Sequence, residues 1–175
     1  MGSATPPARL PQQALWELIR DIRYAMLTTL GEDGRVHSRP LLTLNRETHE
    51  DESLWFFVSV GSETAEDLQR DPRVGVTYAD PGKEHYVAVS GRARAVDSRA
   101  KRDALWTGRA RTWFPQGPDD PDLLLMEVRI EQAEYWDVHG SRMVQLLQRA
   151  RAAVTGESVA APHAEHCEVD FRGEA

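Results

Sequence analysis

The sequence predicts a mainly β protein of the α+β class, built as a small antiparallel barrel with short helices beside it. About six or seven short runs have the apolar, β-branched and aromatic composition of strands. Turns of hairpin length join most of these runs, and the helical segments do not alternate with them as a doubly wound parallel sheet requires. Closing such short strands into a barrel removes their exposed edges.

Clusters of Gly, Asp and Pro separate the strand runs. The turn "GEDG" lies between the first two runs and predicts a β-hairpin, and Gly91 predicts a bulge in the fifth run. The run 123–138 is consistent with two strands or with one strand continuous through a bend. The expected strands are 24–30, 35–44, 54–60, 73–80, 85–96, 123–138 and a short one at 167–171.

Four segments have the spacing or the caps of helices. The first, from Pro11 to Ile22, carries apolar residues at i, i+3, i+4 and i+7. Ser62 is the expected N-cap of a second helix that ends before Pro72, and an Asp-Ser pair at 97–98 begins a third. A fourth is expected within 141–154, whereas 107–122 is rich in Gly, Pro and Asp and predicts a loop.

Length and composition indicate one cytoplasmic domain. The chain has 175 residues, 41% of them hydrophobic, which is enough for a sizeable core. The single cysteine, Cys167, excludes an intramolecular disulfide and fits a reducing compartment. No apolar run is long enough to span a bilayer, and no secretory signal pattern is present. The net charge of −7 argues against a nucleic-acid or anionic-membrane partner.

One dipeptide does not fit an ordinary strand. Arg39 and Pro40 stand side by side within the second strand run. Proline has no N–H to donate and is confined to edges, bulges and strand starts. We therefore expect this dipeptide to face something other than another strand.

Hydroxyls, this arginine and aromatic rings gather near the ends of the expected strands, at 28–29, 38–40, 59–64 and 106–115. A flat aromatic ligand with a phosphorylated tail requires this mixture. Its ring packs against apolar walls, and its phosphate binds arginine, hydroxyls and helix N-terminal amides. Each feature has a plainer explanation, because Ser62 is a sufficient helix cap and the aromatic rings can be core residues.

Other chemistry has little support. His163 and His166 are three residues apart, but no partner set has zinc-site spacing, so we expect no metal. Dinucleotide, P-loop and nucleophile-elbow motifs are absent.

Five blocks, in order along the chain, resemble a known family. They are "AMLTTLGEDGRVHSRPL", "LWFFVSVGSETAEDLQRDPRVGVTYADP", "YVAVSGRARAVDSRAKRDALW", "WFPQGPDDPDLLLMEV" and "AEYWD". This chain resembles the general stress protein 26-like branch of the pyridoxamine 5'-phosphate oxidase-related, FMN-binding split barrels. The resemblance implies a six-stranded antiparallel split barrel that forms a homodimer, with FMN bound in clefts between the subunits.

The resemblance also implies positions for the cofactor. Arg39 would reach the phosphate, Pro40 and Leu41 would follow the flavin edge, and the aromatic residues would close over the cofactor. The ribityl-phosphate would lie along the end of the third strand and the start of the second helix. The implied cofactor-binding residues are Arg39, Pro40, Leu41, Ser59, Val60, Ser62, Thr64, Trp106, Trp113 and Phe114.

The chain departs from the family in two places. The family usually has a phosphate-binding lysine where this chain has Thr64, and Glu63 adds a negative charge beside it; Arg111 is a candidate replacement for the lost cation. The substrate-binding Arg/His block of true pyridoxamine phosphate oxidases is not evident near the C-terminus, so that activity is not expected.

The segment 1–10 is rich in Pro and Ala and is expected to be disordered. The resemblance implies an FMN-binding barrel domain 11–138 and a C-terminal helix and tail 139–175 that packs on the barrel or on the dimer partner. It implies flavin-dependent oxidoreductase activity, with a stress role by analogy alone. No catalytic residue is assigned; His37 shares the strand face of Arg39. Two alternatives stay open: a non-catalytic flavin-binding or sensing dimer, and a split barrel that uses the deazaflavin F420 or haem.

Overall fold

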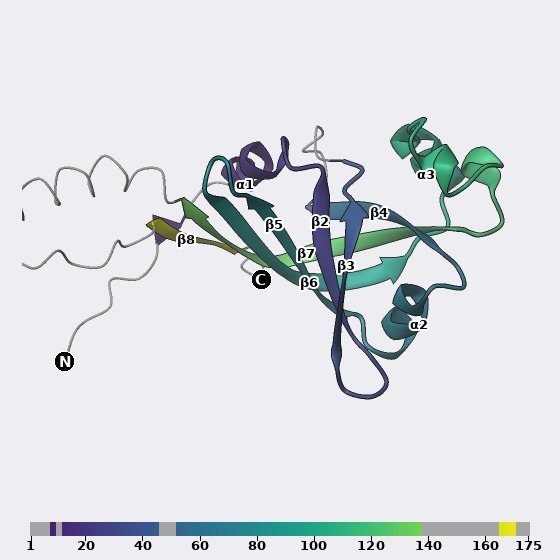
Figure 1. The fold of residues 1–175 in the computed structure, drawn as a ribbon, viewed down its shortest axis with the longest axis horizontal. Coiled ribbons are helices and arrows are strands. Elements are labelled where there is room, and N and C mark those ends of the chain that lie inside the picture. Colours follow the sequence, from purple (N-terminus) through teal and green to yellow (C-terminus); the bar gives the residue numbers. More distant parts are fainter. Residues whose placement is uncertain (1–7, 10–11, 46–51, 138–164, 171–175) are drawn as a thin grey trace, which may run out of the picture.

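The computed structural model describes residues 8–9, 12–45, 52–137 and 165–170, and its main feature is one strongly curled sheet (Figure 1). In the described chain the strands pair in the order β1-β8-β7-β6-β5-β2-β3. The long strand β7 pairs with β4 along its first half and with β8 along its second half. The strands are β1 Ala8–Arg9, β2 Tyr24–Leu30, β3 Val36–Leu42, β4 Ser53–Ser59, β5 Arg73–Asp80, β6 His85–Ala95, β7 Leu123–Asp137 and β8 Glu165–Asp170.

Six of these strands form a barrel that is open along one line. They follow one another as β4-β7-β6-β5-β2-β3, and every pairing among them is antiparallel. β3 and β4 end this path and do not pair with each other in the described chain. This arrangement confirms the predicted six-stranded antiparallel split barrel. The parallel pair β1–β8 extends the sheet beyond the barrel.

The position of β3 accounts for the proline within it. Pro40 lies opposite Met26 of β2, and β3 has no strand partner along its other edge in the described chain. A missing N–H therefore costs no ladder hydrogen bond on that open edge. Pro40 therefore lies on an edge strand, with β2 on one side and no strand on the other in the described chain.

Among the described residues three helices flank the barrel: α1 Gln12–Ile19, α2 Glu63–Arg70 and α3 Arg99–Leu105. The predicted cap of α2 is confirmed, because Ser62 Oγ accepts a hydrogen bond from the Ala65 N–H at 3.3 Å. Ser98 caps α3 in the same way, at 3.2 Å from the Lys101 N–H. No helix in the described residues is long and apolar enough to cross a membrane.

The core fills the barrel and the space under α1. Leu15, Trp16 and Ile19 of α1 are buried against side chains of the inner sheet face, which include Leu27 and Val76. The apolar face predicted for this helix is therefore confirmed, and it removes the hydrophobic end of the barrel from water.

Three segments differ from, or fall outside, the sequence-based expectations. The expected loop 107–122 contains two single 3₁₀ turns, η1 Ala110–Thr112 and η2 Gly117–Asp119. The run from 123 forms one continuous strand rather than two. Within the segment 1–10, Ala8–Arg9 form β1, while the helix expected in 141–154 and most of the tail lie outside the described residues.

Candidate functional site

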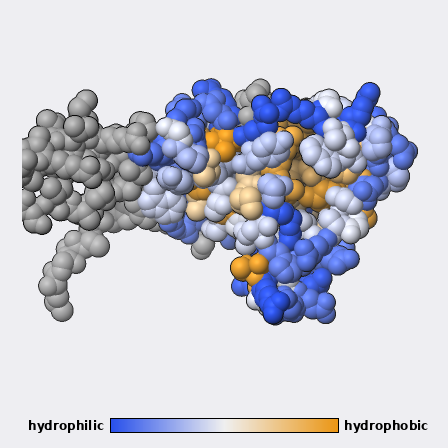
Figure 2. Space-filling model, viewed as in Figure 1, coloured by the Kyte–Doolittle hydropathy of each residue, from blue (hydrophilic) through white to orange (hydrophobic). Residues whose placement is uncertain are grey.

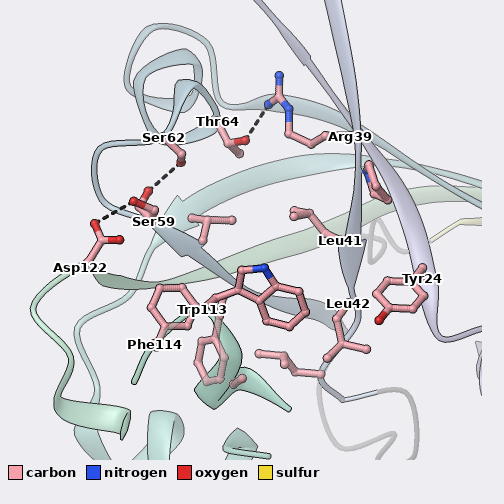
Figure 3. Close-up of a pocket in the computed structure, with 15 residues that line it drawn as sticks. Tyr24, Arg39, Leu41, Leu42, Ser59, Ser62, Thr64, Trp113, Phe114 and Asp122 are labelled. Atoms are coloured by element: carbon pink, nitrogen blue, oxygen red, sulfur yellow. Dashed lines mark hydrogen bonds between the residues drawn. The ribbon is translucent and has the colours of Figure 1, made fainter. Parts of the chain in front are cut away.

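A cavity of about 430 Å³ lies in the split between β3 and β4 (Figure 3). The end of β3, the end of β4, the first residues of α2 and the segment around η1 enclose it. Its lining residues are Tyr24, Arg39, Pro40, Leu41, Leu42, Leu44, Phe57, Val58, Ser59, Ser62, Thr64, Ala110, Trp113, Phe114 and Asp122. In Figure 2 hydrophobic surface gathers in a hollow between more hydrophilic rims.

One end of the cavity is apolar and aromatic. Phe114 is buried and meets Phe57 edge-on, with ring centroids 6.3 Å apart. Trp113 is 61% exposed although its indole is largely apolar. Figure 3 shows this indole lying across the cavity, with Phe114 beside it. An exposed tryptophan facing apolar walls forms a slot for a flat ring.

The other end is polar and centres on Arg39. Its Nη1 donates hydrogen bonds to Thr64 Oγ1 at 2.7 Å and to Thr29 Oγ1 at 3.0 Å. Its Nη2 lies 3.4 Å from a carboxylate oxygen of Glu63 and 3.7 Å from one of Asp67. The guanidinium thus faces the cavity while two carboxylates hold it from the side of α2.

The buried carboxylate of Asp67 lies beside the Arg39 guanidinium. Its side chain is only 2% exposed, and Thr29 Oγ1 donates a hydrogen bond to it at 2.6 Å. Burial by itself raises the pKa of this carboxyl, but the Thr29 hydrogen bond and the neighbouring His37 and Arg39 together hold the pKa below its ordinary value. Asp67 is therefore a carboxylate at neutral pH and fixes the position of the arginine.

A short chain of hydrogen bonds connects the end of β4 with the start of α2 and of β7. Ser62 Oγ donates to the Ser59 carbonyl at 2.6 Å, and Ser59 Oγ donates to Asp122 Oδ1 at 2.7 Å. The Val60 N–H donates to the Asp122 carbonyl at 2.8 Å. These groups line one wall with oxygen atoms suited to bind the hydroxyls of a ligand.

The structure brings most of the expected site residues together and leaves two outside. Val60 contributes its backbone to the hydrogen-bond chain, but its side chain is exposed and does not line the cavity. Trp106 packs against Phe57, with ring centroids 5.9 Å apart, and lines a separate cavity. The residues that line the cavity as expected are Arg39, Pro40, Leu41, Ser59, Ser62, Thr64, Trp113 and Phe114.

His37 and Arg111, which the sequence analysis also singled out, both lie outside the cavity lining. His37 Nδ1 is 3.1 Å from a Glu63 carboxylate oxygen and 3.5 Å from one of Asp67, so it belongs to the polar network without lining the cavity. Arg111, the candidate replacement cation, is exposed on η1 and is not part of the lining.

Several lining residues were not anticipated. Phe57 stands two residues before Ser59 on β4, so strand alternation alone would have placed it on the same face. Tyr24, Leu44 and Asp122 carry no comparable signal, because only the curl of the sheet brings them to the split. Among the described residues no group of His, Cys, Asp and Glu is arranged to hold a metal ion.

The curled sheet and its open seam define the class: a split β-barrel protein with a cavity at the split. The chain belongs to the pyridoxamine 5'-phosphate oxidase-like family, whose model matches residues 11–160. It is 26% identical over 123 residues to general stress protein 26 of Bacillus subtilis strain 168, a match that covers 69% of this chain and 84% of that protein.

Solved structures share this fold. A chain assigned to general stress protein 26 from Jannaschia sp. CCS1 superposes with a TM-score of 0.69 at 24% identity, over 91% of this chain and 97% of that one. The general stress FMN/FAD binding protein from Xanthomonas citri superposes with a TM-score of 0.62 at 27% identity, over 72% and 87% of the two chains.

Proposed function

We propose that this protein is an FMN-binding flavoprotein with flavin-dependent oxidoreductase activity, acting as a cytoplasmic homodimer with a role in stress response. The observation that carries the proposal is the two-ended cavity, in which aromatic and aliphatic walls lead to Arg39 and a set of hydroxyls. The similar protein from Xanthomonas citri is named for FMN/FAD binding, which supports the ligand class.

The residues present fit a flavin. The cavity volume of about 430 Å³ lies in the usual range of ligand pockets. Trp113 and Phe114 would cover the isoalloxazine ring and exclude water, and Leu41 would pack along its edge. Ser59 and Ser62 would bind the ribityl hydroxyls. At the far end Arg39 and Thr64 would hold the phosphate, and Arg39 is the one basic residue among the lining residues that the structure describes.

When bound, the flavin supplies the capacity to accept and donate electrons or hydride. The chain itself binds and orients that group. β3 has no strand partner along its open edge in the described chain, so its backbone polar groups there are free to bind the edge of a ring. No residue of the cavity is assigned a proton-transfer role.

The exposed apolar residues support a dimer next to the cavity. Tyr24, Met26 and Tyr86 are exposed, and they line a second cavity together with Trp136. Tyr24 lines both cavities. A second copy seated on these residues would remove them from water and would also contact the flavin site.

Binding is tested with purified protein dialysed against FMN. We expect flavin absorbance that stays with the protein after gel filtration, quenched flavin fluorescence, and elution at the mass of a dimer. Protein that retains no flavin absorbance and leaves flavin fluorescence unchanged would contradict the proposal.

A non-catalytic flavin-binding function is the second candidate. It is favoured by the absence of the family's lysine, which leaves Arg39 as the one basic residue among the described lining residues. Steady NAD(P)H oxidation by the FMN-loaded protein would exclude this candidate, provided that Arg39→Met abolishes the turnover. Arg92→Met is the matched control, because Arg92 is exposed and pairs with Glu131 away from the cavity.

A further inference from the structure

The polar end of the cavity carries more negative than positive charge. Arg39 is the one basic residue among those that line the cavity in the described chain. Glu63 and Asp67 lie within ion-pair distance of its Nη2, and Asp122 lines the wall beyond Ser59. His37, even when protonated, is itself shared between Glu63 and Asp67.

The two carboxylates beside Arg39 are not equivalent. Asp67 is buried and bonded to Thr29, so it balances the charge of Arg39 as a fixed part of the fold. Glu63 is 62% exposed and accepts a hydrogen bond of 3.4 Å from Nη2, the same nitrogen that lies 3.7 Å from Asp67. Glu63 therefore lies where an anionic ligand group would approach Arg39 from solvent.

A phosphate monoester carries close to two negative charges at neutral pH. To reach Arg39 it would have to displace the Glu63 carboxylate or remain beside it. In both cases the repulsion or the lost ion pair offsets much of the attraction of the single arginine. The hydroxyls of a sugar-alcohol chain meet no such repulsion, because carboxylates and serine oxygens accept hydrogen bonds from them.

We propose that Glu63 makes this cavity insensitive to the terminal phosphate, so that it accepts the non-phosphorylated flavin, riboflavin, nearly as tightly as FMN. This inference rests on the proposed flavin-binding function and specifies its ligand class: the ring and the ribityl hydroxyls carry the affinity. Glu63 acts as a specificity residue, which competes with the ligand's phosphate for Arg39.

The test compares the dissociation constants of FMN and riboflavin for the full chain, measured by quenching of flavin fluorescence. The two ligands share the ring and the ribityl chain, so damage to the fold affects both and cancels in the ratio of their constants. Glu63→Gln removes the charge with little change of shape. Glu66→Gln is the matched control, because Glu66 lies in the same first turn of α2 but pairs with Arg70.

For the wild type we expect FMN to bind less than about tenfold more tightly than riboflavin. Glu63→Gln should strengthen FMN binding by about tenfold and leave riboflavin binding unchanged, while Glu66→Gln should change neither. A wild-type preference for FMN of tenfold or more would overturn the inference while leaving the flavin site intact. The inference is also overturned if Glu63→Gln changes the dissociation constants of FMN and riboflavin by the same factor. If neither flavin binds, the proposed function fails and this inference fails with it.

Discussion

Replacing Arg39 by methionine should destabilise the fold, although this side chain lies at the cavity. Methionine keeps most of the side-chain length and removes the charge. The change removes two hydrogen bonds to the threonine hydroxyls of Thr29 and Thr64, each worth about 1 kcal/mol net. It also removes the guanidinium whose Nη2 lies 3.7 Å from the buried carboxylate of Asp67.

Removing one partner of a fully buried ion pair costs about 3–5 kcal/mol. The cost is smaller here, because Arg39 is 20% exposed and Arg70 lies 3.7 Å from the other Asp67 oxygen. We therefore expect a total loss of about 2–4 kcal/mol in the free energy of unfolding. With a denaturant slope of about 1–3 kcal/mol per molar, the urea midpoint should fall by at least about 0.7 M.

Urea denaturation at pH 7 measures this loss, and Arg92→Met is the control, with an expected change below about 0.5 kcal/mol because its pair with Glu131 is exposed. A double-mutant cycle with Asp67→Asn should give a coupling energy of at least about 1 kcal/mol. If Arg39→Met unfolds at the same midpoint as the wild type, Arg39 does not stabilise Asp67 and the account of the polar network is wrong.

Three further predictions test other parts of the structure. Because the folded-state pKa of Asp67 lies below its ordinary value of 3.8, this carboxylate stabilises the fold fully above that value and loses its contribution as the pH falls through the folded pKa. The destabilisation by Asp67→Asn should therefore shrink between pH 7 and pH 3 in urea titrations. Gly91→Ala would place a Cβ 2.2 Å from the Arg129 carbonyl oxygen at the bulge of β6. It should therefore lower the free energy of unfolding, measured by thermal unfolding, by about 2–3 kcal/mol. Gly61→Ala is the control, because its Cβ would meet no atom within 4 Å and stability should not change. Trp113→Ala should leave stability within about 0.5 kcal/mol of the wild type, because the ring is exposed, yet weaken flavin binding by up to about tenfold; an unchanged flavin affinity would remove Trp113 from the site.

Two of the strands with alternating burial could be predicted to the residue. The runs 24–30 and 73–80 coincide with β2 and β5, in which buried and exposed residues alternate. Their ends are set by local signals, which the sequence carries. The segment 107–122 was harder, because Gly, Pro and Asp favour both open loops and single 3₁₀ turns. In η2 the choice depends on Gly117, whose φ of 82° and backbone hydrogen bonds are not visible in composition.

For the candidate site, the residues indicated hydroxyls, Arg39 and aromatic rings at the ends of the expected strands, and the resemblance supplied the role expected of each. The helical spacing of Glu63 and Asp67 places both carboxylates on one face of α2. No local signal says that this face turns toward Arg39, because that depends on how β4 leads into the helix. Trp106 and Trp113 also have similar surroundings in sequence. Only the turn at η1 places Trp106 against Phe57, outside the cavity, and Trp113 in the cavity lining.

Arg39 both anchors the polar network and lines the cavity, and the different burial of its two carboxylate partners separates these roles. Displacing Asp67 would leave a buried charge unpaired, a cost that a reversible ligand contact does not recover. Displacing Glu63 leaves no buried charge unpaired, but the freed carboxylate stays near the ligand's phosphate and repels it. A ligand anion therefore competes with Glu63 for Arg39, while Asp67 keeps the guanidinium in place. It follows that Glu63→Gln should change anion affinity without the loss of stability expected for Arg39→Met, so the two roles can be measured separately in one protein.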